Sequence, residues 1–344
     1  MAMQTSGKPG STSEFWIRSI STFGGSNAAL VLIDGFERDL NEVSVEDVES
    51  FTVLKDASAT AIYGSKGANG VILVNTKRGK EGKINISAKL EGFYSMLTKV
   101  PDFADGYTYA SLANEAKTTR NQDVLYQPEE LEIFRLGLDP DLYPDVDWMD
   151  VLLRDGSWSS RATLNMSGGG RTARYFVSGS YQDQQGMYKV DKSLKDYNTN
   201  ANFRKYTYRM NVDIDITKTT LLKVGVSGSL RKQNDAGIGS DAIWTALMGY
   251  NPIMAPILYS NGLVPAYGND NGDRFNPWVQ ATMTGYRENW DNNIQTSVVL
   301  DQKLDFITKG LFFTGRFGYD TENSNWIRRY TVSYTHLTLP TNRE

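Results

Sequence analysis

The sequence predicts a mainly β fold built from long antiparallel strands that each have one apolar and one polar face. From about residue 84, apolar residues recur at every second position, which is the period of a β-strand. Short and long connections alternate between these segments. The 344 residues include 31 Gly, 19 Tyr and 7 Trp, which are typical of strands, turns and interfaces rather than of helix bundles.

The first element is a Gly-rich stretch, "IYGSKGANGVILVNTKRG", at residues 62–79, with glycines at 64, 67 and 70 around Lys66. A phosphate-binding loop follows a strand, opens a helix and ends in Gly-Lys-Ser/Thr. Here a small-residue helical turn precedes the glycines, and the β-branched strand comes after them. The stretch therefore predicts a tight helix-to-strand turn. A nucleotide-dependent enzyme, the alternative, requires ATP binding that is lost in Lys66→Ala.

The strands that follow alternate between apolar and polar residues, which predicts that each is buried on one face only. Their apolar positions are Ile84, Ile86, Ala88, Leu90, Tyr94, Tyr206, Tyr208, Met210, Val212, Ile214, Ile216, Leu222, Val224, Val226, Leu230, Ile294, Val298, Leu300, Leu311, Phe313, Phe317 and Tyr319. About ten residues at ~3.3 Å each span the ~25 Å apolar band of a membrane with some tilt.

The connections distinguish a membrane barrel from a soluble sandwich. Short links lie at 168–174, 217–220 and 307–310, and the long ones run over 95–160, 183–204 and 232–292. Outer-membrane barrels have short periplasmic turns and long external loops, with apolar side chains toward lipid and polar ones toward the lumen. We therefore predict the wall of a transmembrane β-barrel. The tyrosines near strand ends fit either an interfacial aromatic belt or ordinary strand propensity. They are Tyr94, Tyr181, Tyr206, Tyr208 and Tyr319.

Composition excludes several functions. A net charge of -4 with a pI near 5.3 gives no basic field, so we predict no nucleic-acid partner. The absence of cysteine excludes disulfides and thiolate catalysis. The only histidine is His336, which leaves no basis for a Ser-His-Asp triad or a His-rich metal site. We predict no enzyme, and assign no catalytic residue, metal or cofactor.

A family resemblance adds to this interpretation. The segment "LVLIDGFERDLNEVSVEDVESFTVLKDASATAIYGSKGANGVILVNTKRGKEGK", residues 30–83, closely resembles the plug-domain signature of SusC/RagA-type TonB-dependent outer-membrane receptors. Its signature residues are Lys55, Asp56, Tyr63, Gly64, Gly67 and Gly70. "FADGYTYASLANEA", "WMDVLLRDGSWSSRATLNMSGGGRTARYFVSGSYQDQQG" and "YRMNVDIDITKTTLLKVGVSGSL" look like the first barrel strands of that family. The resemblance covers residues from about 30 to 334.

The resemblance implies a role and partners. It implies import of large nutrients, oligosaccharides or peptides, across the bacterial outer membrane, driven by TonB and assisted by a SusD-like surface lipoprotein. Outer-membrane lipid would surround the barrel. The alternative is a non-transporting structural or adhesive outer-membrane β protein.

The resemblance also implies a domain division. Residues 1–82 would be the C-terminal part of a plug domain, and residues 83–334 the first strands, about eight, of an antiparallel transmembrane β-barrel of about 22 strands. The tail, 335–344, breaks the family pattern and is expected to be artefactual. The match lacks a signal peptide, a TonB box and the early plug, so we expect an internal fragment. We expect a barrel left open by truncation, with an unpaired edge, an exposed apolar outer face and a tendency to aggregate.

Two groups of side chains are candidates for contacts. Aromatic residues in the long segment 232–292 are candidates to stack on substrate or to contact the lipoprotein lid, while packing in a loop core is the alternative. They are Trp244, Tyr250, Tyr259, Tyr267 and Trp278. On the lumen side, strand parity nominates arginines to pair with plug carboxylates. These are Arg209, Arg231 and Arg316 on the strands, with Asp34, Asp47 or Asp56 in the plug.

Overall fold

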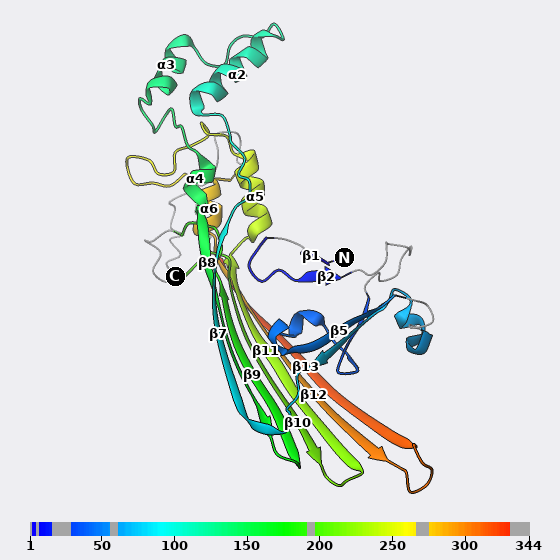
Figure 1. Ribbon diagram of the computed structural model, residues 1–344. Helices are drawn as coiled ribbons and strands as arrows, with labels where there is room; N and C mark the ends of the chain where they lie inside the picture. The colour runs from blue at the N-terminus through cyan, green and yellow to red at the C-terminus, as the bar shows by residue number, and fades with distance from the viewer. Residues whose placement is uncertain are drawn as a thin grey trace, which may run out of the picture.

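The computed structural model describes residues 2–4, 7–15, 29–55, 61–190, 197–265 and 275–330 (Figure 1). Among them, one seven-stranded antiparallel sheet accounts for most of the strands, and a four-stranded sheet and a two-stranded hairpin account for the rest. The predicted tail, 335–344, lies outside the described residues.

The large sheet, called the wall below, is a continuous meander in which each strand pairs with its neighbours in sequence. Its strands are β7 (Gly82–Met96), β8 (Gly156–Gly169), β9 (Ala173–Gln184), β10 (Asn202–Asp215), β11 (Thr220–Ala236), β12 (Gly285–Lys303) and β13 (Phe312–Tyr330). In the described residues, β7 and β13 are the two edges. This confirms the predicted mainly β, antiparallel fold.

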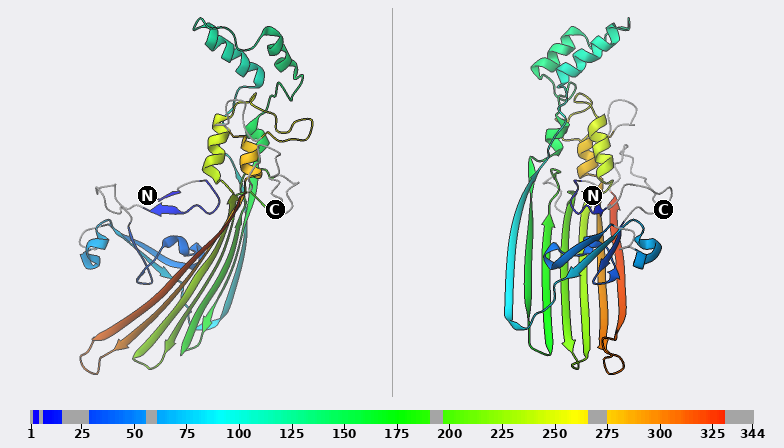
Figure 2. Two further views of the ribbon diagram at one scale, coloured as in Figure 1. Left: turned by 180° about the vertical axis from the view of Figure 1, so that it is seen from behind. Right: turned by 45° about the vertical axis from the view of Figure 1, so that its right-hand side comes forward.

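The connections of the wall confirm the predicted alternation. The short turns all lie at one end of the sheet, and the long, partly helical segments lie at the other (Figure 1, Figure 2). The helices of the long segments are α2 (Gly106–Thr118), α3 (Pro128–Leu136), α4 (Trp148–Leu152), α5 (Ser240–Gly249) and α6 (Pro277–Thr282). Among the described residues, no helix is both long and apolar enough to pass through a membrane.

The number of strands differs from the expected eight or so, because the described residues form seven in the wall. The difference comes from strand length. The last two strands, β12 and β13, each contain 19 residues, against the roughly ten needed to cross the apolar band. Seven long strands therefore occupy the chain as far as Tyr330, and their ends extend beyond the apolar alternation that marks them in the sequence.

The small sheet lies where the sequence predicts the plug, on the concave side of the wall (Figure 2). We call this sheet and its 3₁₀ helices the plug. It comprises β3 (Leu30–Ile33), β4 (Phe36–Glu37), η1 (Leu40–Glu42), η2 (Val45–Asp47), β5 (Val48–Leu54), η3 (Ala61–Gly67) and β6 (Val71–Thr76). Strand β6 pairs in parallel with β3 and antiparallel with β5, and Ile33, Ile72 and Val74 form its small core. A separate hairpin pairs β1 (Ala2–Gln4) with β2 (Ser13–Phe15).

The Gly-rich stretch forms the predicted helix-to-strand turn, from η3 into β6. Gly64 has φ +61° and Gly70 has φ +98°, which are conformations that residues with a side chain rarely adopt. Gly67 is buried in the same turn. The helix precedes the strand, which is the reverse of the order that a phosphate-binding loop requires. The glycines therefore allow the tight turn between η3 and β6, and they do not form a phosphate-binding loop.

Candidate functional site

In the central strands, β8 to β12, the two faces of the wall have opposite polarity and the polar face is the more buried one, whereas the edge strands β7 and β13 are largely exposed on both faces. On β10, Arg209 is 4% exposed, whereas its neighbour Met210 is 42% exposed. Other buried polar residues of β10 and of the strands on either side lie on the same face as Arg209, namely Thr163, Ser178, Asn211, Asp213, Ser227, Ser229, Gln295 and Ser297. The exposed outer face instead carries large apolar side chains, including Ile86, Leu90, Leu164, Tyr206, Tyr208, Leu230, Ile294, Phe313, Phe317 and Tyr319. This confirms the predicted parity of the strands.

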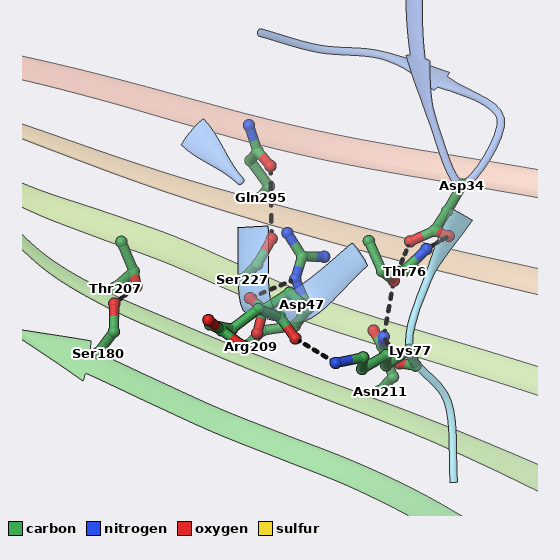
Figure 3. Close-up of polar contacts among 11 residues, drawn as sticks. Asp34, Asp47, Thr76, Lys77, Ser180, Thr207, Arg209, Asn211, Ser227 and Gln295 are labelled. Carbon is green, nitrogen blue, oxygen red and sulfur yellow. Dashed lines mark hydrogen bonds and ion pairs between the residues drawn. The ribbon is translucent and has the colours of Figure 1, made fainter. Parts of the chain in front are cut away.

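The polar face is buried because the plug packs against it, most closely along β10 (Figure 3). Asn211 donates from Nδ2 to Thr76 Oγ1 at 2.9 Å and to the carbonyl of Lys77 at 2.7 Å. Two residues further along, Asp213 accepts from Arg78 Nη1 at 2.6 Å. Alternate residues of one strand thus bind the segment that leaves β6.

The third contact of this row is a buried ion pair between Asp47 and Arg209. Arg209 Nε lies 3.2 Å from Asp47 Oδ2, and the two side chains are 4% and 5% exposed. The carbonyl of Asp47 also accepts from the amide of Lys77, which links η2 to the end of β6. Asp47 Oδ1 is buried without a hydrogen-bond partner among the described residues. Because a buried charge that has lost its partner is costly, removal of either side chain would destabilise the seated plug.

Further ion pairs join the plug to the wall, and they carry both signs. Arg231 pairs with Glu42 at 3.2 Å, and Lys89 pairs with Glu46 at 2.8 Å. In another pair the plug supplies the cation and the wall the anion, because Arg38 donates to both carboxylate oxygens of Asp320. Plug anions thus face wall cations at some places, and plug cations face wall anions at others. This mixed pattern favours one orientation of the plug, because a rotated plug would bring like charges together.

The predicted pairing of lumen arginines is confirmed for Arg209, which binds Asp47. Arg231 binds Glu42 instead of the nominated aspartates, and Arg316 lies against Gly35. Asp34 accepts from the amide and hydroxyl of Thr76 within the plug, and Asp56 lies outside the described residues.

The resemblance implied that Arg78 would face lumen polar groups or solvent, but sequence reasoning did not name its partner, and it missed the pair that Arg38 makes with the wall. The signal that could have found them was the parity of Asp213 and Asp320, which places both on the lumen side. These carboxylates share a face with Arg209 and Arg316, respectively.

The signature residues of the Gly-rich stretch lie at the plug surface. Tyr63 is half-buried, and Lys55 follows β5 in an exposed position. Lys66 pairs with Glu37 at 2.6 Å, with both side chains more than half exposed. Such an exposed pair contributes little to stability. It leaves Lys66 in contact with solvent and another plug residue.

The aromatic candidates mostly pack within the long segments. Tyr250 is 5% exposed and meets Trp148 edge to face, while Trp244 and Trp278 pack against the same core. Tyr250 also lines a cavity of about 630 Å³ together with Tyr109 and Trp148. Tyr259 is half-buried in a turn, and Tyr267 lies outside the described residues. Their contact with a substrate or lid therefore stays a prediction.

Tyr188 is also buried, and it belongs to the same core as Trp148 and Tyr250. Desolvation raises the pKa of its phenol to about 12, so the side chain stays neutral. Within the described residues, no three or more His, Cys, Asp or Glu side chains converge as a possible metal site.

Comparison with known proteins identifies related chains. A family model described as TonB-dependent Receptor Plug Domain matches residues 1–71. The TonB-dependent receptor P3 of Formosa agariphila is 29% identical over 325 residues, covering 92% of this chain and 29% of that protein. The TonB-dependent receptor SusC of Bacteroides thetaiotaomicron is 32% identical over 221 residues, covering 60% of this chain and 19% of that one. The chain therefore spans less than a third of either relative.

A solved structure shares the fold. The RagAB peptide importer in its open-open state superposes with a TM-score of 0.75 at 22% identity, covering 95% of this chain and 38% of that one. The likeness includes both the plug and the wall, because it extends over nearly the whole chain. The plug-domain match and the receptor relatives place the chain in the SusC/RagA-type family of TonB-dependent receptors, and the solved structure shows the same fold.

Proposed function

We propose that this chain supplies the plug and one side of the barrel wall of an importer in the bacterial outer membrane. The importer takes up large nutrients, oligosaccharides or peptides, and releases them inward when TonB acts on the plug. A SusD-like surface lipoprotein covers its outer opening. We keep the division predicted from the sequence, with the plug in 1–82, the barrel in 83–334 and a non-family tail in 335–344.

One observation carries this proposal, namely the inverted burial of the wall. A soluble sheet buries its apolar face, but here the apolar face is exposed and the polar face is covered by the plug. An apolar exterior and a polar, plugged interior are what a wall between lipid and an aqueous passage requires. The receptor names of the relatives agree with this role.

Growth of the native host tests the proposal. A panel of oligosaccharides and peptides is supplied, each as the sole nutrient. We expect deletion of the complete receptor gene to abolish growth on one class of these nutrients. Deletion of TonB should give the same defect, because the energy for import comes through it. Uptake of the labelled nutrient by intact cells is the direct readout.

Complementation of the deletion strain distinguishes an importer from a nucleotide-dependent enzyme, and the phenotype of the deletion itself distinguishes an importer from a structural or adhesive protein. The gene with Lys66→Ala should restore growth fully, because Lys66 pairs only at the plug surface. Loss of uptake together with loss of ATP binding in this variant would instead favour a nucleotide-dependent enzyme. If the deletion strain grows normally on the whole panel but attaches poorly to surfaces, the protein is a structural or adhesive outer-membrane protein.

A further inference from the structure

A polar cavity interrupts the apolar outer face of the wall near the end that carries the long segments. It has a volume of about 300 Å³ and lies over β10, β11 and β12. Arg204, Lys232 and Glu288 line it, together with Asn202, Asn234 and Tyr286. All these strand residues continue the outward-facing rows of Met210, Leu230 and Ile294. The cavity therefore opens on the side of the wall opposite the plug.

The position of the cavity along the strands corresponds to the edge of a membrane. Arg204 is six positions from Met210, near the middle of β10, which is ~20 Å along an extended strand. With the usual tilt, that distance reaches from the centre of the apolar band to its boundary. Between them lie Tyr206 and Tyr208, both exposed, and Trp290 lies on β12 nearby. Aromatic residues at this depth are typical of the membrane interface.

The two cations of the cavity retain donors that can bind an anion. Asp183 accepts from Arg204 Nε at 2.9 Å, a contact that does not use the two Nη groups. Lys232 Nζ lies 2.6 Å from Glu288 and 5.1 Å from the ring centre of Trp290. Arg204 and Lys232 are direct partners in the pairing of β10 with β11, so the two residues are neighbours on the outer face.

The rest of the cavity is bounded by aromatic and amide side chains. Tyr197 stacks on Tyr286 with ring centres 5.7 Å apart, which folds the segment before β10 over the outer face. Asn234 donates from Nδ2 to the carbonyls of Asn198 and Asn200, which holds that segment in place. A third cation, Arg329, lies 5.9 Å from the ring centre of Tyr286. The three cations Arg204, Lys232 and Arg329 thus face the two carboxylates of Asp183 and Glu288, which leaves an excess of positive charge around the cavity.

We infer that this cavity binds the phosphate of a lipid headgroup in the outer leaflet, through Arg204 and Lys232. The acyl chains of that lipid would lie on the apolar outer face beside Tyr206 and Leu230, which is why a lipid rather than free phosphate fits the site. The inference rests on the proposed function to the extent that the wall lies in a membrane. Its consequence is a lipid bound specifically at one place on the barrel.

Native mass spectrometry of the full-length receptor in detergent tests the inference. The probes are phosphatidic acid, diacylglycerol with the same acyl chains, and inorganic phosphate. We expect phosphatidic acid to bind, with little retention of the other two. The double variant Arg204→Gln/Lys232→Gln should weaken phosphatidic acid binding at least about tenfold, because two charge-assisted contacts are lost. Arg204→Lys, which keeps the charge, should retain much of the binding.

A matched control comes from α3, where Arg135 pairs with Glu132 on an exposed surface remote from the wall. Arg135→Gln removes a comparable surface arginine and should leave lipid binding unchanged. Equal binding by the double variant and the parent receptor, or equal retention of diacylglycerol and phosphatidic acid, would overturn the inference. Inorganic phosphate bound as tightly as the lipid would reject a lipid source.

The assay needs no transport, so the inference and the proposed function fail separately. A receptor that imports nutrient without specific lipid binding rejects the inference alone. A receptor that binds phosphatidic acid through Arg204 but imports nothing keeps the inference and rejects the proposed function.

Discussion

Charge reversal at Asp47 is expected to loosen the plug strongly. In Asp47→Lys, two cations would meet where Asp47 and Arg209 are now almost fully buried. Removing one partner of a buried ion pair typically costs about 3–5 kcal/mol, because the remaining charge is left unpaired. In the complete receptor, the plug should therefore leave its seat at a lower urea concentration. Conductance across a planar bilayer, recorded during a urea titration, reports this release.

The controls for this prediction use the same chain. Swapping the charges, in Asp47→Arg/Arg209→Asp, should recover part of the loss, and the recovered part is the coupling between the two side chains. Lys66→Glu reverses a charge in the exposed pair with Glu37 and should change plug stability by less than about 1 kcal/mol. An unchanged urea midpoint in Asp47→Lys would show that this ion pair does not hold the plug.

A charge on the outer face is expected to impair insertion of the barrel. Met210 lies near the middle of β10, faces away from the plug and is 42% exposed. An arginine near the middle of the lipid-facing surface costs about 2–4 kcal/mol in membrane barrels. Met210→Arg should therefore lower the fraction of complete receptor that folds into lipid vesicles. Electrophoretic mobility before and after heating measures that fraction.

A matched substitution distinguishes lipid exposure from water exposure. Leu112 on α2 is 54% exposed, so Leu112→Arg makes the same kind of change on a surface that we place in water. It should fold as well as the parent protein. Equal folding yields for the two variants would mean that the outer face of β10 does not contact lipid.

The architecture of the wall was predictable because its signal is local and repeated. In β10, the side chains of Arg209 and Asn211 alternate with those of Tyr208 and Met210 along the chain, so the sequence alone assigns each residue to one of the two faces. The order of short and long links then separates one rim from the other. The ends of the strands were less predictable, because residues beyond the apolar alternation, such as those near Tyr330, pair through their backbones regardless of side chain.

The contacts of the plug were predictable only in part. Parity places Arg209 on the lumen side, but it does not give the register between the plug and the wall. The partner of Arg231 depends on where η1 rests, and that position brings Glu42 rather than an aspartate to it. For Trp244 and Trp278, the sequence permits both exposure and packing, and only the folded long segments show that they share a core.

The central claim is that alternate residues of one strand face lipid and a polar, plugged interior. Because this chain has no cysteine, a single cysteine placed on β10 is unique within these 344 residues, and it can be labelled with a fluorophore in a receptor from which any cysteines outside this chain have been removed. Lipids that carry a quencher in their acyl chains should quench labels at positions 208, 210 and 212 and spare those at 207, 211 and 213. Quenching with no alternation, or with the opposite phase, would contradict the account.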